Sequence, residues 1–373
     1  MTTTIHLSGP ADVLVVLPYQ LGYHPSDCLV ALSLHGTSVG LVQRIDLPPP
    51  QHVGDAAAAM IGPLLRDNPR SVLLVGFEDR EDESRPMLDT MAAACRAHGV
   101  RVANRLVVRG GRWFDPDCEE HCCPPGGLPL PDPSEVPAVA EFVGRGICPM
   151  PSRAALADQL EISRPLLSRA VSVLADEWLA LRLEATDARA TDPDVREAEL
   201  HVCRANELAV WSRVLRDGDD AEPIHALPPQ DLAKLAVSLT DVDLRDGLIA
   251  WLCPGTLPQD LVDPSLFVQM SRMLLKPLLL DRGVGEAGDI GEVERVIHLQ
   301  RVERRLCELC AALPDEWAVA ALTVLANFTW WRGDGALTRV ALGRALRVDP
   351  RYRLALLLEQ MVDGVIRPER ESA

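Results

Sequence analysis

Aromatic side chains are scarce in this sequence. They make up 4% of the 373 residues, although 47% of the residues are hydrophobic. The cores must therefore be built mainly from Leu, Val and Ala, which favours helices and parallel sheet over an all-β sandwich. A chain of this length exceeds the usual size of a single hydrophobic core, so we expect two or three domains.

Positive charge and long apolar runs are also lacking. The formal net charge of -17 disfavours binding to nucleic acid and to anionic membranes. The apolar run at 13–18 is too short for a signal peptide, and the one at 317–331 is too short to span a bilayer. We therefore expect a cytoplasmic protein without membrane contact, in which the ten cysteines are mostly reduced.

Common catalytic signatures are missing as well. In the N-terminal part, no Gly-x-Gly-x-x-Gly or Walker-type loop opens a helix, so a nucleotide-binding fingerprint is absent there. The chain has no His-Glu-x-x-His, and no Gly-x-Ser-x-Gly forms a nucleophile elbow between a strand and a helix. These absences remove the commonest hydrolase and zinc-protease signatures, but they leave open whether the protein is an enzyme.

Strand-like and helix-like patterns alternate along the first 115 residues. After an apolar helix come two strands, 28–34 and 38–47, whose short connection predicts a hairpin. The strands at 71–77 and 101–108 each follow a helix. This α-β-β-α-β-α-β order predicts an α/β domain over residues 1–132, with a mixed sheet, packed helices and a final loop rich in Cys, Pro and Gly.

Helical periodicity dominates the rest of the chain. It predicts a helical region over residues 133–283 and a second one, built from repeat-like helical hairpins, over 284–373. The segment at 281–289 breaks the pattern and is typical of a linker. The expected fold class is an α/β N-terminal domain followed by an all-α region.

Three motifs follow one another along the chain. They are LPYQLGYHPSDCLVAL at 17–32, GGRWFDPDCEEHCCPPGGLPLP at 110–131 and WWRGDGALTRVALGRALRVDPRYRLALLL at 330–358. With these motifs the chain resembles an uncharacterised actinobacterial family, domain of unknown function 4192, over nearly its full length. The resemblance implies an intracellular protein and brings no activity or ligand with it. Relatives tend to have serine where this chain has Cys28, which argues against a nucleophile at that position.

The stretch CEEHCCPPGG at 118–127 raises the question of a metal site. Zinc is most often held by four ligands that come from Cys-x-x-Cys pairs. Here three residues separate Cys118 from Cys122, and adjacent Cys122 and Cys123 normally point apart. Two interpretations stay open. One is a zinc site built from Cys118, His121 and Cys122 or Cys123, with Cys148 as a distant fourth ligand; the other is a metal-free loop packed against the sheet.

Charged residues follow the strands at one edge of the predicted sheet. Arg44 and Asp46 end the hairpin, Glu78 follows the next strand, and Arg112 follows the last one. Ligands of α/β sheets usually bind at the carboxyl ends of strands. If these residues converge, they would bind a small anionic ligand or act as a general acid and base. The alternative is a set of surface ion pairs.

Residues 151–183 resemble the helix-turn-helix of bacterial repressors. The second helix would carry Arg164, Ser168 and Arg169 into the major groove. However, the acidic segment at 184–194 does not predict the β-hairpin that forms the wing in such repressors. The second helix also carries only two arginines, whereas the chain as a whole has a net charge of -17. A helix pair within a bundle accounts for the same residues, so binding to nucleic acid is the less favoured interpretation.

The C-terminal segment resembles part of a tetratricopeptide repeat. Leu342, Ala345 and Pro350 match the second helix and closing proline of such a repeat. One copy cannot form a solenoid, so the segment either caps the bundle or offers a groove to a partner peptide. Trp330 and Trp331 are adjacent, so at least one of them faces away from the local core, which favours a contact surface.

Two functions remain open from the sequence. The preferred hypothesis is a cytoplasmic, non-catalytic interaction or regulatory protein whose helical half contacts a protein partner. It depends on the repeat-like end and on the missing catalytic motifs. The alternative is an enzyme or small-ligand sensor whose site lies at the carboxyl edge of the sheet. The sequence identifies no cofactor with certainty, no particular partner and no oligomeric state.

Overall fold

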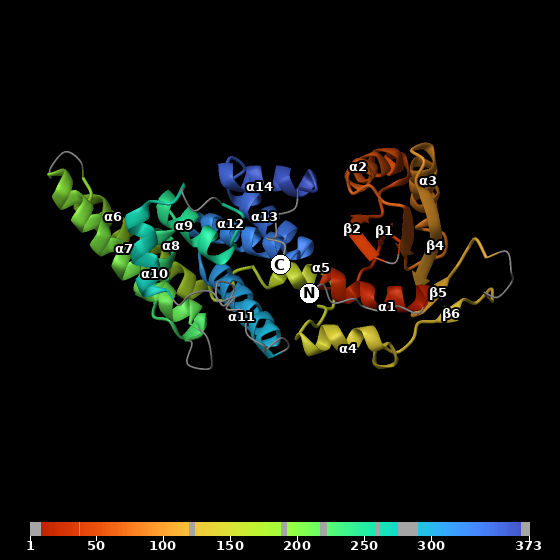
Figure 1. Ribbon diagram of the computed structural model, residues 1–373, viewed down its shortest axis with the longest axis horizontal. Coiled ribbons are helices and arrows are strands. Elements are labelled where there is room, and N and C mark those ends of the chain that lie inside the picture. The colour runs from red at the N-terminus through yellow and green to blue at the C-terminus, as the bar shows by residue number, and fades with distance from the viewer. Residues whose placement is uncertain are drawn as a thin grey trace. The chain divides into compact units, whose positions relative to one another are not determined.

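The chain divides into two compact units. One comprises residues 1–153 and 363–366, and the other comprises residues 154–362 and 367–373. The first contains the sheet and the second is helical (Figure 1), and we call them the sheet unit and the helical unit. The computed structural model describes residues 9–36, 38–118, 124–187, 192–216, 222–257, 261–274 and 290–366.

Six strands form one mixed sheet with the order β2-β1-β3-β4-β5-β6. β1 pairs antiparallel with both β2 and β3, while β3 pairs parallel with β4. The predicted hairpin and the helical crossover between parallel strands are both present. The sequence pattern does not predict β5 and β6, because they lie in a segment that is typical of a loop. The strands are β1 (Cys28–His35), β2 (Ser38–Asp46), β3 (Ser71–Phe77), β4 (Arg101–Arg109), β5 (Arg112–Phe114) and β6 (Leu128–Pro129).

Helices cover both faces of this sheet. One face packs against α2 and α3 in a core that includes Leu29, Leu74 and Met91. In Figure 1, α1 lies on the opposite side of the sheet, and its Val16 packs in one cluster with Phe142 of α4. Central strands covered on both sides are continuous apolar runs, which is why β1 and β3 are readily recognised. The helices are α1 (Pro10–Leu21), α2 (Val53–Arg66), α3 (Arg85–Ala97) and α4 (Pro137–Gly144).

The helical unit is built from α-helices and a single 3-10 turn among its described residues. Aspartates begin several of the helices; for example, the side chains of Asp241 and Asp263 accept backbone N–H groups at the starts of α9 and α10. The helices are α5 (Arg153–Asp158), α6 (Pro165–Ala185), α7 (Pro193–Leu215), α8 (Pro229–Ser238), α9 (Val242–Leu252), α10 (Pro264–Met273), α11 (Ile290–Ala312), α12 (Asp315–Arg332), α13 (Gly335–Val348) and α14 (Arg353–Asp363).

The last helices include a tight helical hairpin. α12 ends at Gly333, whose φ of 90° is left-handed, and Asp334 begins α13 by accepting the N–H of Leu337. The hydroxyl groups of Thr329 and Thr338 are 2.9 Å apart across the pair. The predicted fold class, an α/β N-terminal domain followed by an all-α region, is confirmed.

The boundaries of the units bear on the predicted domains. The sheet unit includes α4, which the sequence pattern places in the helical region. The predicted boundary at 283 lies outside the described residues, so the division into three parts stays a prediction. Among the helices that the structure describes, none is both long and apolar enough to cross a membrane.

Candidate functional site

The ends of β2, β3 and β4 share one edge of the sheet, as the sequence predicts. Cys28, at the start of β1, lies opposite both Asp46 and Phe77, and Phe77 lies opposite Val108. Arg44 forms an ion pair of 2.5 Å with Asp46 there. Burial raises the pKa of the neighbouring Cys28 thiol to about 11, so the thiol stays protonated at neutral pH. Cys28 is fully buried and packs in the core of the sheet unit.

Glu78 is the most enclosed of the predicted edge residues. Its carboxylate accepts hydrogen bonds from the backbone N–H and the hydroxyl of Ser84, at 2.8 and 2.6 Å, and from Arg109 at 2.8 Å. The Glu78 side chain is 2% exposed, and the Arg109 guanidinium lies 4.6 Å from the centre of the Phe114 ring. This group of bonds joins the end of β3 to the start of α3 and to β4.

The strand order keeps the predicted site residues apart. β1 separates Arg44 and Asp46 from Glu78, and Arg112 donates to the carbonyl oxygens of Gly126 and Gly127 at 2.6 and 2.8 Å. In the described part of the chain, no hydrogen bond or ion pair joins Arg44 or Asp46 to Glu78 or Arg112. The ligand site at this edge stays a prediction.

The zinc site lies mostly outside the described residues. His121, Cys122 and Cys123 fall within 119–123, which the structure does not describe, whereas Cys118 is half-buried and Cys148 is exposed. In the remaining described chain, no group of three or more His, Cys, Asp or Glu residues is placed to hold a metal ion. Zinc binding therefore stays a prediction.

The helix-turn-helix-like segment forms α5 and α6, and it is integrated in the helical unit. Ser168 is buried, and Arg164 donates to the carbonyl oxygen of His225 at 3.2 Å. Of the three residues proposed to enter the major groove, only Arg169 is exposed without a bond to another described residue. These contacts are those of a helix within a bundle.

The two adjacent tryptophans are half-buried on α12. Trp331 donates its indole N–H to the carbonyl oxygen of Pro254 at 3.1 Å, and its ring centre lies 6.1 Å from that of Phe328. Trp331 thus joins α12 to the turn after α9. A role of Trp330 and Trp331 in partner binding stays a prediction.

The letters Gly-x-Ser-x-Gly occur at residues 36–40, in the turn between β1 and β2. A nucleophile elbow joins a strand to a helix, whereas this turn joins two strands. His35 lies opposite Ser38 and its Nε2 is 2.9 Å from Asp67, but among the described residues no hydrogen bond joins Ser38 to His35. The arrangement is therefore not a catalytic triad.

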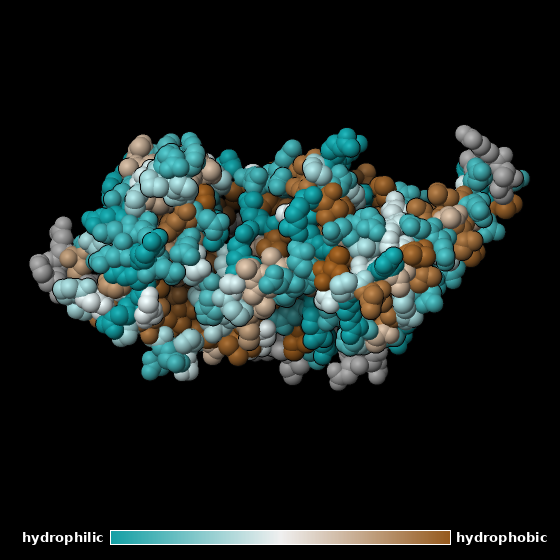
Figure 2. Space-filling model, turned by 180° about the vertical axis from the view of Figure 1, so that it is seen from behind, coloured by the Kyte–Doolittle hydropathy of each residue, from teal (hydrophilic) through white to brown (hydrophobic). Residues whose placement is uncertain are grey.

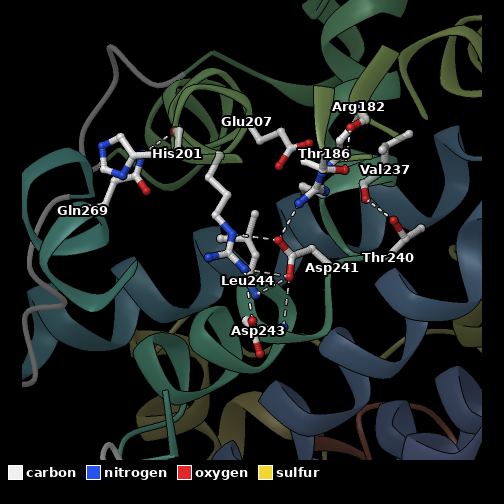
Figure 3. A network of polar contacts seen from close by, with 12 residues as sticks. Arg182, Thr186, His201, Glu207, Val237, Thr240, Asp241, Asp243, Leu244 and Gln269 are labelled. Atoms are coloured by element: carbon white, nitrogen blue, oxygen red, sulfur yellow. Dashed lines mark hydrogen bonds and ion pairs between the residues drawn. The ribbon is translucent and has the colours of Figure 1, made fainter. Parts of the chain in front are cut away.

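A buried charge network lies where α6, α7 and the start of α9 meet (Figure 3). Arg204 donates to Asp241 through Nε and Nη2, at 2.8 and 3.0 Å, and Arg182 donates to the same carboxylate through Nη2. Arg182 and the indole of Trp178 also donate to one oxygen of Glu207, each at 3.2 Å. The four charged side chains are at most 9% exposed.

Two glutamates of the helical unit, Glu207 of this network and Glu303 of α11, are expected to make the stability of the unit depend on pH. Burial raises the pKa of Glu207 to about 7, although Arg182 opposes the shift. Burial likewise raises the pKa of Glu303 to about 7. Because an unfolded Glu titrates near ~4.3, the folded state binds more protons between these values, and its stability falls as pH rises.

Raising the pH from 6 to 8 should therefore lower the free energy of unfolding by roughly 1 kcal/mol for each of the two glutamates. Urea denaturation followed by tryptophan fluorescence tests this, because six of the seven tryptophans lie in the helical unit. Glu207→Gln keeps an acceptor oxygen but cannot titrate, so it should reduce the dependence by about half. A wild-type stability that is the same at both pH values would contradict the prediction.

A groove of about 660 Å³ opens beside the network. Leu179 and Leu183 of α6 and Leu200 of α7 give it apolar walls, while Arg182, Arg204 and Asp241 line its buried part. Arg196, Glu197 and Asp243 complete the charged lining. The groove thus combines an aliphatic surface with guanidinium groups that are already held in place.

A second feature of α6 is an apolar stripe on its outer face. Leu166, Val173 and Leu181 are 87%, 56% and 59% exposed, whereas Val171 and Ala175 are fully buried on another face. In Figure 2, hydrophobic side chains are interspersed with hydrophilic ones on the helices at the right of the view. Six of the thirteen large apolar side chains that are exposed in the described residues lie on α6 and α7. We call Leu166, Val173 and Leu181 the outer α6 stripe.

Comparison with known proteins identifies the family. A family model described as domain of unknown function (DUF4192) matches residues 10–277 and 293–369. The chain belongs to this family. No curated protein and no solved structure matches it.

Proposed function

We propose that this chain is a cytoplasmic, non-catalytic interaction protein whose helical half binds a protein partner. The partner presents a basic amphipathic helix, which packs along the outer α6 stripe. The observation that carries the proposal is the exposure of three large apolar side chains on one face of one helix. Single exposed apolar residues are normal in soluble proteins, but several that share one face of a helix favour a contact surface. The polar groups at the sheet edge are engaged in bonds within the protein and give no support to a catalytic pair.

The spacing of the stripe fits a helical partner. Leu166 and Val173 are seven residues apart and Leu181 follows eight residues later, which is close to the seven-residue spacing along the seam between two paired helices. Ala170, Glu177 and Glu184 alternate with them, and the last two are exposed carboxylates. A partner helix would place apolar residues against the first set and Lys or Arg against the glutamates.

Charge disfavours a second copy of the chain as the occupant. Two outer stripes packed together would bring Glu177 and Glu184 of both copies into one seam, close to the exposed Asp176. Like charges that face each other across an interface cost binding free energy. A basic segment is instead attracted by these carboxylates, and its binding should weaken as salt is added because salt screens the attraction.

A synthetic amphipathic peptide with Leu at the seam and Lys beside it is the probe for this site. We expect it to bind the full chain in fluorescence anisotropy, and Val173→Glu with Leu181→Glu should weaken binding at least tenfold, or ~1.4 kcal/mol. Leu357→Glu is the matched control, because Leu357 is 54% exposed on α14, much as Val173 is on α6.

Reversing the charge of the glutamates distinguishes specific binding along the seam from non-specific binding of the peptide. The double variant Glu177→Lys with Glu184→Lys should bind the Lys peptide more weakly than the wild type does. It should instead bind a second peptide that keeps the Leu residues and has Glu in place of Lys. Equal binding of the Lys peptide by wild type, the stripe variant and the charge-reversed variant would overturn the proposal. Dimerisation of the wild type that Val173→Glu abolishes would show that a second copy is the occupant, which also overturns it.

A further inference from the structure

The groove between α6 and α7 contains guanidinium groups with unused donors. Asp241 accepts from Nε and Nη2 of Arg204, and Asp243 also accepts from Nη2 at 3.2 Å, but Nη1 of Arg204 has no partner in the described part of the chain. Arg196 lines the same groove and forms no ion pair with a described carboxylate. Donors held in a fixed direction by their own hydrogen bonds lose little freedom when an anion binds.

The rest of the lining defines the kind of anion. Leu179, Leu183 and Leu200 supply aliphatic surface, and the volume of about 660 Å³ lies within the usual size of ligand sites. Three carboxylates oppose an anion: Asp241 lies at the buried end, where it accepts from Arg182 and Arg204, Glu197 lines the groove, and Asp243 lies beside Arg204 with 62% of its side chain exposed. The negative group must therefore be small and must lie on the side of Arg196 and Arg204.

We infer that this groove is a binding site for a carboxylate attached to an aliphatic chain. The carboxylate accepts from Arg196 and from Nη1 of Arg204, and the chain lies along the three leucines. This site uses a face of α6 different from the outer α6 stripe, so its occupancy is independent of the proposed partner helix. Two sources carry this chemistry, a short fatty acid and the C-terminus of a protein that ends in leucine.

Isothermal titration calorimetry on the full chain tests the site with two pairs of probes. Octanoate is compared with octanol, and an N-acetylated peptide that ends in Leu-Leu with a free carboxylate is compared with its amide. We expect at least one carboxylate to bind and its neutral counterpart to bind at least tenfold more weakly. Binding of octanoate alone identifies a small-molecule source, and binding of the peptide alone identifies a protein C-terminus.

Four variants locate the binding. Arg196→Gln should weaken it at least fivefold, Glu197→Gln should tighten it because a repelling charge is lost, and Arg169→Gln, at an exposed arginine earlier on α6, should leave it unchanged. Val173→Glu should also leave it unchanged, which separates this site from the outer α6 stripe. The inference is overturned if neither carboxylate binds, if the neutral probes bind equally well, or if Arg196→Gln has no effect.

Discussion

Replacing Asp241 by Ala is expected to lower the free energy of unfolding of the helical unit by roughly 3–5 kcal/mol, the usual cost of removing one partner from a buried ion pair. Asp241 holds two arginines whose side chains are each 8% exposed, and it also begins α9. Without it, the carboxylate partners that remain among the described residues are Glu207 for Arg182 and the solvent-exposed Asp243 for Arg204. Urea denaturation followed by tryptophan fluorescence measures the loss.

Asp263→Ala is the matched control for this substitution. Asp263 begins α10 as Asp241 begins α9, through hydrogen bonds to the second and third backbone N–H groups. No arginine forms an ion pair with Asp263 in the described chain, so its removal costs mainly the helix cap and the hydrogen bond from the Ser265 hydroxyl, about 1 kcal/mol. Equal losses in the two variants would show that the charge network contributes no net stability beyond the cap.

The sequence predicts the elements of this fold well, because their periodicity is regular. β1 and β3 are largely apolar runs, and both strands lie where the sequence pattern places them, at 28–34 and 71–77. The short strands β5 and β6 escape prediction because pairing with a neighbouring strand, β5 with β4 and β6 with β5, makes them strands rather than any pattern of their own. α4 joins the sheet unit through its packing against α1, which no local pattern reveals.

The buried network was not predictable as a set, although one signal of it is present in the sequence. Val171, Ala175, Trp178 and Arg182 recur at helical spacing on α6, so a charged residue continues an otherwise apolar face. A buried arginine requires a buried carboxylate, which identifies Arg182 as a member of a network. Its partners lie 25 and 59 residues further along the chain, so only tertiary packing identifies them.

The residues of the sheet edge illustrate the opposite case. The sequence places Arg44, Asp46 and Glu78 at the correct edge, because strand direction follows from the order of elements. Which arginine meets Glu78 depends on strand order and on the turn at Gly110 and Gly111, and the observed partner is Arg109. Position along the chain therefore predicts the neighbourhood of a side chain but not its bonds.

The second large effect is expected at this edge, where Glu78→Ala should lower the local stability of the sheet unit by roughly 3 kcal/mol. The substitution removes the acceptor of the Ser84 N–H and the closest, buried partner of Arg109. Hydrogen exchange of the β3 and β4 amides measures the change. The control is Glu81→Ala, since Glu81 lies 3.7 Å from the same Arg109 but is 79% exposed. Its removal should change stability by less than about 0.5 kcal/mol.

The comparison of Glu78 with Glu81 also decides between structure and chemistry at the sheet edge. A carboxylate that only stabilises the fold should cost stability when it is removed and should leave any ligand binding by the folded protein unchanged. A buried carboxylate kept for binding or proton transfer is often a source of instability, and its removal then costs little or even stabilises the fold. A small loss of stability in Glu78→Ala would therefore favour a ligand site at the sheet edge. The expected large loss of stability indicates that Glu78 stabilises the fold, and it leaves the helical unit as the binding half of the protein.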